Sequence, residues 1–175
     1  MRNTRQMTLC ALFAALCAAC AQIQIPTQTA AMSLALLAVH LCGALLPPSQ
    51  ALTAMVVYLL MGALGLPVFS GFRGGIGVLL DRSGGYIIGY VACAWLGSRL
   101  MQGQSSPWRM LMAMGVRTLA CYALGTAWFM VITSSPLWTS LTLCVIPFIP
   151  VDIAKIALAV LLTKRLRTPL RRLIK

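Results

Sequence analysis

The sequence predicts an all-α membrane protein that forms one transmembrane domain over residues 1–175, with six membrane-spanning helices. The chain is 60% hydrophobic and only 9% charged, and its mean hydropathy is +0.90. A bilayer accepts about 20 consecutive apolar residues as one spanning helix, and this chain has several such runs. The runs do not alternate between apolar and polar residues, which argues against a transmembrane β-barrel.

Clear breaks in the apolar pattern separate the expected spans. Prolines or polar residues interrupt the pattern near residues 26, 47–49 and 102–107, and the glycine-rich stretch "GLPVFSGFRGGIGVLLDRSGGY" occupies residues 65–86. Residues 134–147 are too short and broken to span, so we expect a short helix that lies on or dips into the membrane surface. The predicted spans cover residues 7–25, 32–47, 50–65, 84–101, 108–133 and 148–167.

The positive charges predict the orientation of the chain. Arg73 and Arg82 would lie in loops on one side, and Arg117 and Lys155 within spans. Ten of the 14 Lys and Arg residues would lie on the opposite side of the membrane. By the positive-inside rule that side faces the cytoplasm, which places both termini there. Because the basic residues flank spans and are not interleaved with aromatic residues, they indicate topology and anionic lipid and do not indicate nucleic-acid binding. The ten cytoplasmic cations would be Arg2, Arg5, Arg99, Arg109, Lys164, Arg165, Arg167, Arg171, Arg172 and Lys175.

Motifs for metal binding, nucleotide binding and catalysis are not found. The seven cysteines lie in or against apolar segments without a nearby histidine or acid, so they are expected to pack as small hydrophobes. The stretch "GFRGGIG" lacks the lysine and the preceding strand of a nucleotide-binding loop. No nucleophile–base pair is apparent, and the chain is therefore not predicted to be an enzyme.

Asp152 and Lys155 are the most informative ionisable residues. Asp152 is one of only two acids in the chain, and it stands at the start of the last span with Lys155 three residues later. Residues at i and i+3 share a helix face, so the carboxylate and the ammonium should point the same way. Two hypotheses follow: an internal ion pair that anchors the helix end, or a ligand site with one acceptor and one donor.

The sequence also predicts the roles of three further polar or aromatic residues within or next to the spans. His40 lies alone in the middle of a span, where a packing or helix-bridging role is favoured over catalysis. Arg117 lies about two turns into the fifth span and is expected to snorkel to the cytoplasmic interface. The four tryptophans and most tyrosines are expected at membrane interfaces, and Tyr86 is the one aromatic candidate for a site.

Several motifs in order resemble a known family. The segments "YLLMGALGLPVFSGFRGGIGVLLDRSGGYIIGY" and "PFIPVDIAKIALAVLL" resemble the biotin-specific substrate-binding subunits of energy-coupling factor transporters, the BioY family. The similarity extends from residue 37 through the last span. Its most specific parts are residues 65–69, Gly74-Gly75, residues 84–86, and residues 147–155 with their Asp and Lys.

The resemblance implies a six-helix subunit in a prokaryotic cell membrane that binds biotin near the extracellular or periplasmic side. Biotin is the transported ligand, and no cofactor is implied. The glycine-rich stretch is expected to form the lid and wall of the pocket, because irregular backbone at membrane depth survives only around a cavity. Alternatives are the same fold binding another small vitamin, or an intramembrane enzyme. The expected ligand contacts are Phe69, Arg73, Gly74, Gly75, Tyr86, Asp152 and Lys155.

The resemblance also implies partner chains: a transmembrane coupling subunit and two ATPase subunits that supply ATP hydrolysis. Ala11, Ala15 and Ala19 form a small-residue ridge on the first helix, which suits close docking of the coupling subunit. Ala14 and Ala18 form a second such row. Packing within the same subunit is the alternative role for the ridge.

Two stretches depart from the family pattern. Asp81-Arg82-Ser83 stands where relatives read something like Gly-Pro-Thr, and Ser83 is expected to cap the following helix in place of threonine. The opening of the second helix lacks the glutamine of relatives. We expect Gln22, Gln24 or Gln28 to take over the role of the first loop.

Overall fold

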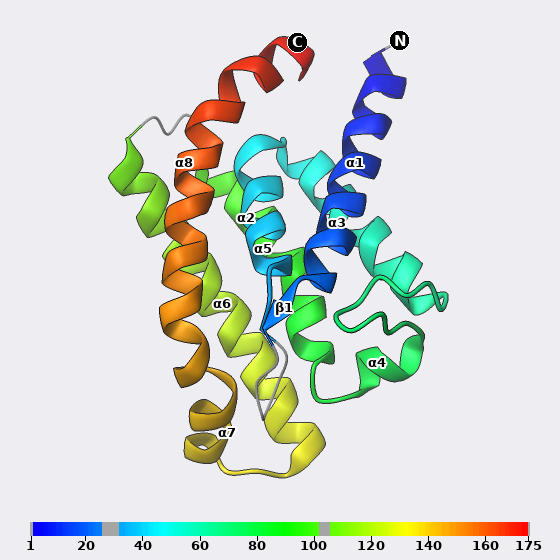
Figure 1. Cartoon of the computed structure of the whole chain (residues 1–175), viewed down its shortest axis with the longest axis vertical. Helices are drawn as coiled ribbons and strands as arrows, with labels where there is room; N and C mark the ends of the chain where they lie inside the picture. The colour runs from blue at the N-terminus through cyan, green and yellow to red at the C-terminus, as the bar shows by residue number, and fades with distance from the viewer. Residues whose placement is uncertain (1, 26–31, 102–105, 175) are drawn as a thin grey trace.

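The computed structural model describes residues 2–25, 32–101 and 106–174, and it is built of helices (Figure 1). Two two-residue strands, β1 (Gln24–Ile25) and β2 (Met32–Ser33), pair antiparallel where the chain passes from the first helix to the second. The predicted all-α fold class is confirmed. The helices are α1 (Arg2–Gln22), α2 (Ala35–Leu45), α3 (Pro48–Ala63), α4 (Ile76–Leu80), α5 (Gly84–Met101), α6 (Pro107–Thr133), α7 (Leu137–Cys144), the 3₁₀ turn η1 (Ile146–Phe148) and α8 (Ile149–Ile174).

Three helical stretches among the described residues are long and apolar enough to cross a membrane: Thr4–Gln22, Pro107–Thr133 and Leu137–Thr168. α2 and α3 are apolar but shorter, with 11 and 16 residues. The prediction of a membrane protein is supported by these helices, and the count of six spans stays a prediction.

The element boundaries follow the predicted spans closely in the second half of the chain. α5 coincides with the predicted span 84–101, and α6 begins one residue before the predicted 108–133. A short helix, α7, lies within the segment 134–147, as expected, and its position at the membrane surface stays a prediction. Two elements differ: α8 continues through the basic residues to Ile174, and the glycine-rich stretch contains the short helix α4 where we expected irregular backbone.

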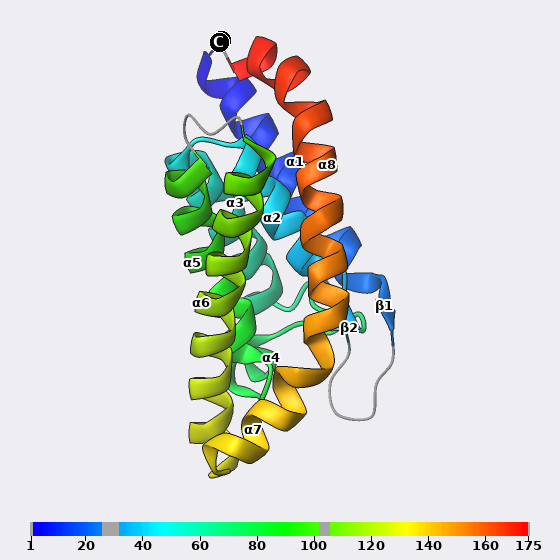
Figure 2. The same cartoon turned by 90° about the vertical axis from the view of Figure 1, so that its left-hand side faces the viewer.

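α2 lies at the centre of the bundle. Each of its 11 residues is buried, which is the environment that a helix apolar on all sides requires. α5 packs against α6, α2 and α3, while α1 packs against α3 and α2, and α8 against α2 and α6. α1 begins and α8 ends at the same end of the bundle, and α7 lies at the opposite end (Figures 1 and 2).

Arg117 does not reach the cytoplasmic interface, so the prediction that it snorkels is wrong. The residue is 0% exposed, and none of its guanidinium nitrogens has a hydrogen-bond partner among the residues that the structure describes. Its side chain lies against Gly43 of α2 and Gly97 of α5. Snorkelling requires a helix face that looks outward, and Arg117 lies on the face of α6 that looks into the bundle.

His40 bridges two helices, in agreement with the prediction. Its Nε2 lies 3.2 Å from Oγ1 of Thr118 on α6, and the Thr118 hydroxyl donates to the carbonyl of Met114 at 3.0 Å. Because the hydroxyl has a single proton and gives it to Met114, His40 Nε2–H is the donor to Thr118. The bond ties the central helix α2 to α6.

Gly97 supplies a test of this packing. A methyl group at Gly97 would collide with the buried Arg117 side chain, whereas a methyl group at Gly115 on α6 would meet no atom within 4 Å. We expect Gly97→Ala to lower the stability by about 1–3 kcal/mol, the usual effect of overpacking. Gly115→Ala should not lower the stability, because alanine forms helices better than glycine. Thermal unfolding in detergent measures the stability of both variants. Equal unfolding temperatures for Gly97→Ala and Gly115→Ala would contradict this packing of Arg117.

Candidate ligand-binding site

A cavity of about 510 Å³ opens between α2, α3, α5, α6, α8 and the glycine-rich stretch. Its size falls in the range of small-molecule sites in proteins. The aromatic residues on its wall are Tyr58, Phe69, Tyr86, Tyr90, Tyr122, Phe129 and Phe148. The polar and charged residues on its wall are Ser33, Ser70, Arg73, Asp81, Arg82, Ser83, Asp152 and Lys155.

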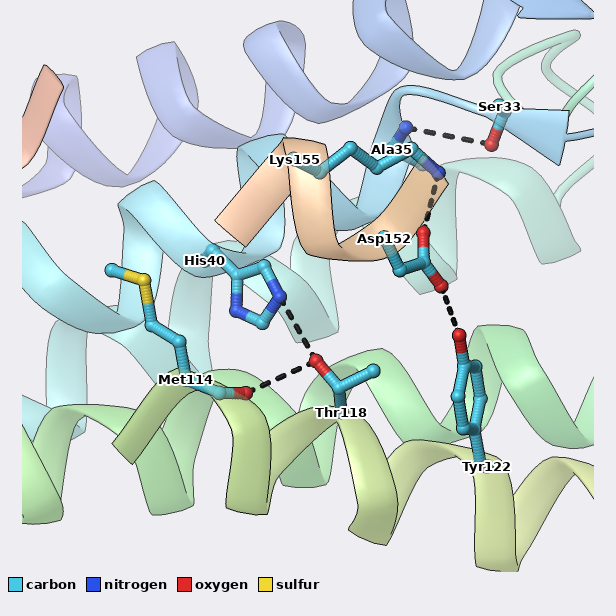
Figure 3. Close-up of polar contacts among 8 residues, drawn as sticks. All are labelled: Ser33, Ala35, His40, Met114, Thr118, Tyr122, Asp152 and Lys155. Carbon is cyan, nitrogen blue, oxygen red and sulfur yellow. Dashed lines mark hydrogen bonds and ion pairs between the residues drawn. The ribbon is translucent and has the colours of Figure 1, made fainter. Parts of the chain in front are cut away.

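Asp152 and Lys155 form a buried ion pair on the wall of this cavity. Asp152 stands in the first turn of α8, where the helix dipole favours an acid, and Lys155 follows one turn later. Lys155 Nζ lies 2.7 Å from Asp152 Oδ1, and the two side chains are only 6% and 5% exposed. The Tyr122 hydroxyl of α6 donates to the other carboxylate oxygen, Oδ2. Lys155 of α8 and Tyr122 of α6 therefore each hold one oxygen of Asp152 (Figure 3).

The pair retains unused hydrogen-bonding capacity. A carboxylate has about four acceptor sites and an ammonium has three donors, and the contacts above occupy only part of each. Both residues border the cavity, so a neutral polar group with donors and an acceptor could bind to the two together. Desolvated charge-assisted hydrogen bonds of this kind are strong and directional.

The glycine-rich stretch forms a compact loop that supplies part of the cavity wall. Gly65, Gly71 and Gly75 have φ values of 98°, 77° and 97°, a backbone region that favours glycine. Phe69 is 1% exposed and lies edge-on to Tyr58, with ring centroids 5.7 Å apart. The loop thereby inserts an aromatic side chain into the wall of the pocket.

Gln22 at the end of α1 fastens this loop. Its Nε2 donates to the carbonyls of Pro67 and Phe69, each at 3.2 Å, and its Oε1 accepts the N–H of Phe72 at 2.9 Å. Of the three glutamines considered for the first loop, Gln22 hydrogen-bonds to the glycine-rich loop, and the Gln24 side chain lies close to Gly71 of the same loop. Gln28 lies outside the described residues.

Charged residues at the outer part of the cavity are more exposed. Arg73 Nη1 lies 3.5 Å from Asp81 Oδ2, and both side chains are 49% exposed. Trp128 Nε1 donates to the Asp81 carbonyl at 3.1 Å, which fixes the Asp81 backbone to α6. Arg82 also lines this part of the cavity.

Ser83 does not cap α5 with its side chain, so that prediction is wrong. Its Oγ is buried and has no hydrogen-bond partner among the described residues. The Ser83 carbonyl accepts the N–H groups of Tyr86 and Ile87 and so begins the helix. Ser83 belongs to the cavity wall, but its hydroxyl oxygen is itself buried.

The structure brings five predicted ligand contacts together around the cavity: Phe69, Arg73, Tyr86, Asp152 and Lys155. Gly74 and Gly75 are not among the lining residues. A Cβ at Gly74 would meet the carbonyls of the loop itself, and the Gly75 N–H donates to the Gly62 carbonyl at 2.6 Å. Both glycines shape the loop, and their contact with a ligand stays a prediction.

Sequence reasoning missed the tyrosines in the middle of the spans. Tyr58, Tyr90 and Tyr122 line the cavity together with Tyr86, whereas we assigned most tyrosines to interfaces. The available signal was their position: a tyrosine deep within an apolar span needs a polar partner for its hydroxyl. Tyr122 finds that partner in Asp152.

The small-residue ridge faces away from the bundle. Ala11, Ala15 and Ala19 are exposed on α1, whereas Ala14 is 1% exposed and packs into the core. The ridge is therefore open to a partner or to lipid, and the second row at Ala14 and Ala18 serves packing inside the subunit.

Comparisons with known proteins agree with this geometry. The model of the BioY family matches residues 1–172. A probable biotin transporter BioY of Pyrococcus horikoshii is 34% identical over 165 residues, which are 94% of this chain and 98% of the relative. The biotin transporter BioY of Thermotoga maritima is 32% identical over 165 residues, 93% of this chain and 96% of the relative.

A solved structure shares the fold over nearly the whole chain. The crystal structure of the S-component for biotin from an ECF-type ABC transporter superposes with a TM-score of 0.85 at 25% sequence identity, covering 95% of this chain and 92% of that chain. The sequence match and the structural match extend over the same helices that build the cavity. The chain belongs to the BioY family.

Proposed function

We propose that this chain binds biotin and mediates its uptake, as the membrane substrate-binding subunit of an ATP-driven transporter in a prokaryotic cell membrane. The observation that carries the proposal is the buried Asp152–Lys155 pair on the wall of an aromatic-lined cavity. Relatives named as biotin transporters, matched over more than nine tenths of this chain, support it.

The chemistry of biotin suits this wall. Its ureido group offers two N–H donors and one carbonyl acceptor, which match the carboxylate of Asp152 and the ammonium of Lys155. The ureido group is neutral, so it can enter the buried part of the cavity without bringing a further charge out of water. The sulfur-containing ring and the apolar part of the tail would pack against Phe69, Tyr58 and Tyr86.

The proposed topology has six spans, both termini in the cytoplasm and the cavity toward the outside. In support, α1 begins and α8 ends at the same end of the bundle, and α4 and the start of α8 lie toward the other end (Figure 1). Most Lys and Arg residues fall near the end that carries the termini, as the positive-inside rule requires for a cytoplasmic side. The short helix α2 has 11 residues, and the surrounding helices bury all of them.

ATP hydrolysis is assigned to partner chains. The sequence "GFRGGIG" lacks the lysine of a nucleotide-binding loop, so we propose a transmembrane coupling subunit and two ATPase subunits as partners. The coupling subunit would dock on the exposed ridge of Ala11, Ala15 and Ala19, where small side chains allow close approach of a second helix.

The ligand role of the buried pair has a direct test. Asp152→Asn and Lys155→Met should each weaken biotin binding to the purified subunit, measured by calorimetry without ATP. Removing one member of a desolvated hydrogen-bonded pair costs about 2–5 kcal/mol. That corresponds to a loss of roughly 30-fold to several thousandfold in affinity. Lys164→Met, an exposed lysine farther along α8, is the matched control and should keep wild-type binding.

The double variant separates the ligand role from a purely structural one. If the pair only anchors the helix, Asp152→Asn combined with Lys155→Met removes both charges and should restore stability and biotin affinity together. If the pair binds biotin, the double variant regains thermal stability but not affinity. Recovery of biotin affinity in the double variant would overturn the proposed site.

Docking through α1 is tested by enlarging the ridge. Ala15→Leu or Ala19→Leu should reduce assembly with the coupling subunit in a pull-down while biotin binding persists, because the larger side chain keeps the helices apart. Ala123→Leu, at an exposed alanine of α6, is the control for added bulk on a membrane-facing helix. Equal assembly of all three variants and the wild type would show that the ridge faces lipid only.

A further inference from the structure

The cavity has two charged regions that differ in exposure. The side chains of Asp152 and Lys155 are 5% and 6% exposed, whereas those of Arg73 and Asp81 are each 49% exposed. Arg82 lines the same cavity as these four residues. The cavity thus has a buried polar region and a solvated mouth, and the mouth has two cations and one acid.

A ligand with a neutral polar head and a carboxylate tail suits the cavity in one orientation, with the head in the buried region and the carboxylate at the mouth. This step rests on the proposed function, in which the ligand is biotin. A carboxylate placed in the buried region would lose its hydration and lie beside the like charge of Asp152, which already neutralises Lys155 at 2.7 Å. At the mouth it keeps part of its hydration and meets Arg73 and Arg82.

The ion pair of Arg73 and Asp81 at the mouth is weak enough for a ligand carboxylate to replace Asp81. The distance from Arg73 Nη1 to Asp81 Oδ2 is 3.5 Å, and both groups face solvent, so the pair is weak. The backbones that carry the two side chains are fixed: the Arg73 carbonyl accepts the N–H of Phe69 at 3.0 Å, and the Asp81 carbonyl accepts Trp128 Nε1. Arg73 Nε is occupied by the Ser70 carbonyl at 3.2 Å, which orients the guanidinium.

We propose that Arg73 and Arg82 form a carboxylate subsite at the mouth of the cavity, and that Asp81 competes with the ligand carboxylate for Arg73. The subsite makes the chain selective for the free acid over the same ligand with its carboxylate converted to an amide. Asp81 moderates this selectivity, because it already neutralises one of the two cations.

The experiment compares biotin with biotinamide, which has the same rings and tail but no charge. The readout is the ratio of the Kd of biotinamide to the Kd of biotin, measured by calorimetry on the purified chain. Asp81→Asn adds one net positive charge to the mouth and should raise the ratio by about twofold to fivefold. Arg82→Gln removes one positive charge and should lower the ratio by a similar factor, and added salt should bring all ratios closer together.

The outcomes distinguish this inference from the proposed function. Shifts of the ratio in opposite directions in the two variants support the carboxylate subsite. A ratio unchanged in both variants while both ligands bind overturns it and leaves biotin binding intact. A ratio that collapses in Lys155→Met but not in Arg82→Gln also overturns it, because the carboxylate would then lie in the buried region. If neither ligand binds to the wild type, the proposed function itself fails.

Discussion

The buried pair of Asp152 and Lys155 is the interaction on which the rest of the site depends. Two charged side chains buried inside a protein lose their hydration, so they need mutual pairing and further hydrogen bonds. The ion pair at 2.7 Å and the hydroxyl of Tyr122 meet this requirement. Because Tyr122 belongs to α6 and the pair to α8, the same contacts hold these two helices together and keep the polar groups at the cavity wall. Stability and the proposed ligand recognition therefore rest on one set of hydrogen bonds.

Small residues set the remaining geometry. Gly43 and Gly97 leave the space that the buried Arg117 side chain occupies, and positive φ angles at loop glycines allow the glycine-rich loop to fold tightly beside the cavity. Gln22 then joins the glycine-rich loop to the end of α1 through three hydrogen bonds. Since α1 also carries the exposed alanine ridge, the helix that we propose for docking is the same helix that holds the glycine-rich loop. Movement of α1 relative to the bundle would change the contacts that keep Phe69 in the cavity wall.

The sequence allowed the fold class, most span boundaries and the central pair to be predicted, because these depend on local signals. Hydropathy shows where helices lie, and the spacing of Asp152 and Lys155 places both on one face whatever surrounds them. Predictions failed where the answer depends on which helix face looks inward. Arg117 was assigned to the interface because its depth in the span was visible, but its direction toward Gly43 and Gly97 was not. Tyr122 was missed for the same reason: its partner Asp152 lies 30 residues away, and only the packing of α6 against α8 brings them together. The hydroxyl of Ser83 was assigned to a helix cap from local sequence, yet the Ser83 carbonyl begins the helix.

The most direct test of the central claim is a solid-state NMR distance between biotin and Asp152. The chain has only two acids, so labelling aspartate with ¹³C at the side-chain carboxyl in an Asp81→Ala background leaves Asp152 as the labelled carboxylate. Biotin labelled with ¹⁵N in the ureido group is then bound in membranes at saturation. A hydrogen bond from the ureido N–H to the carboxylate places the two nuclei about 4 Å apart, given N···O distances of about 2.9 Å, so clear dipolar dephasing is expected. Saturated binding without such dephasing would contradict it and place the ureido group elsewhere in the cavity.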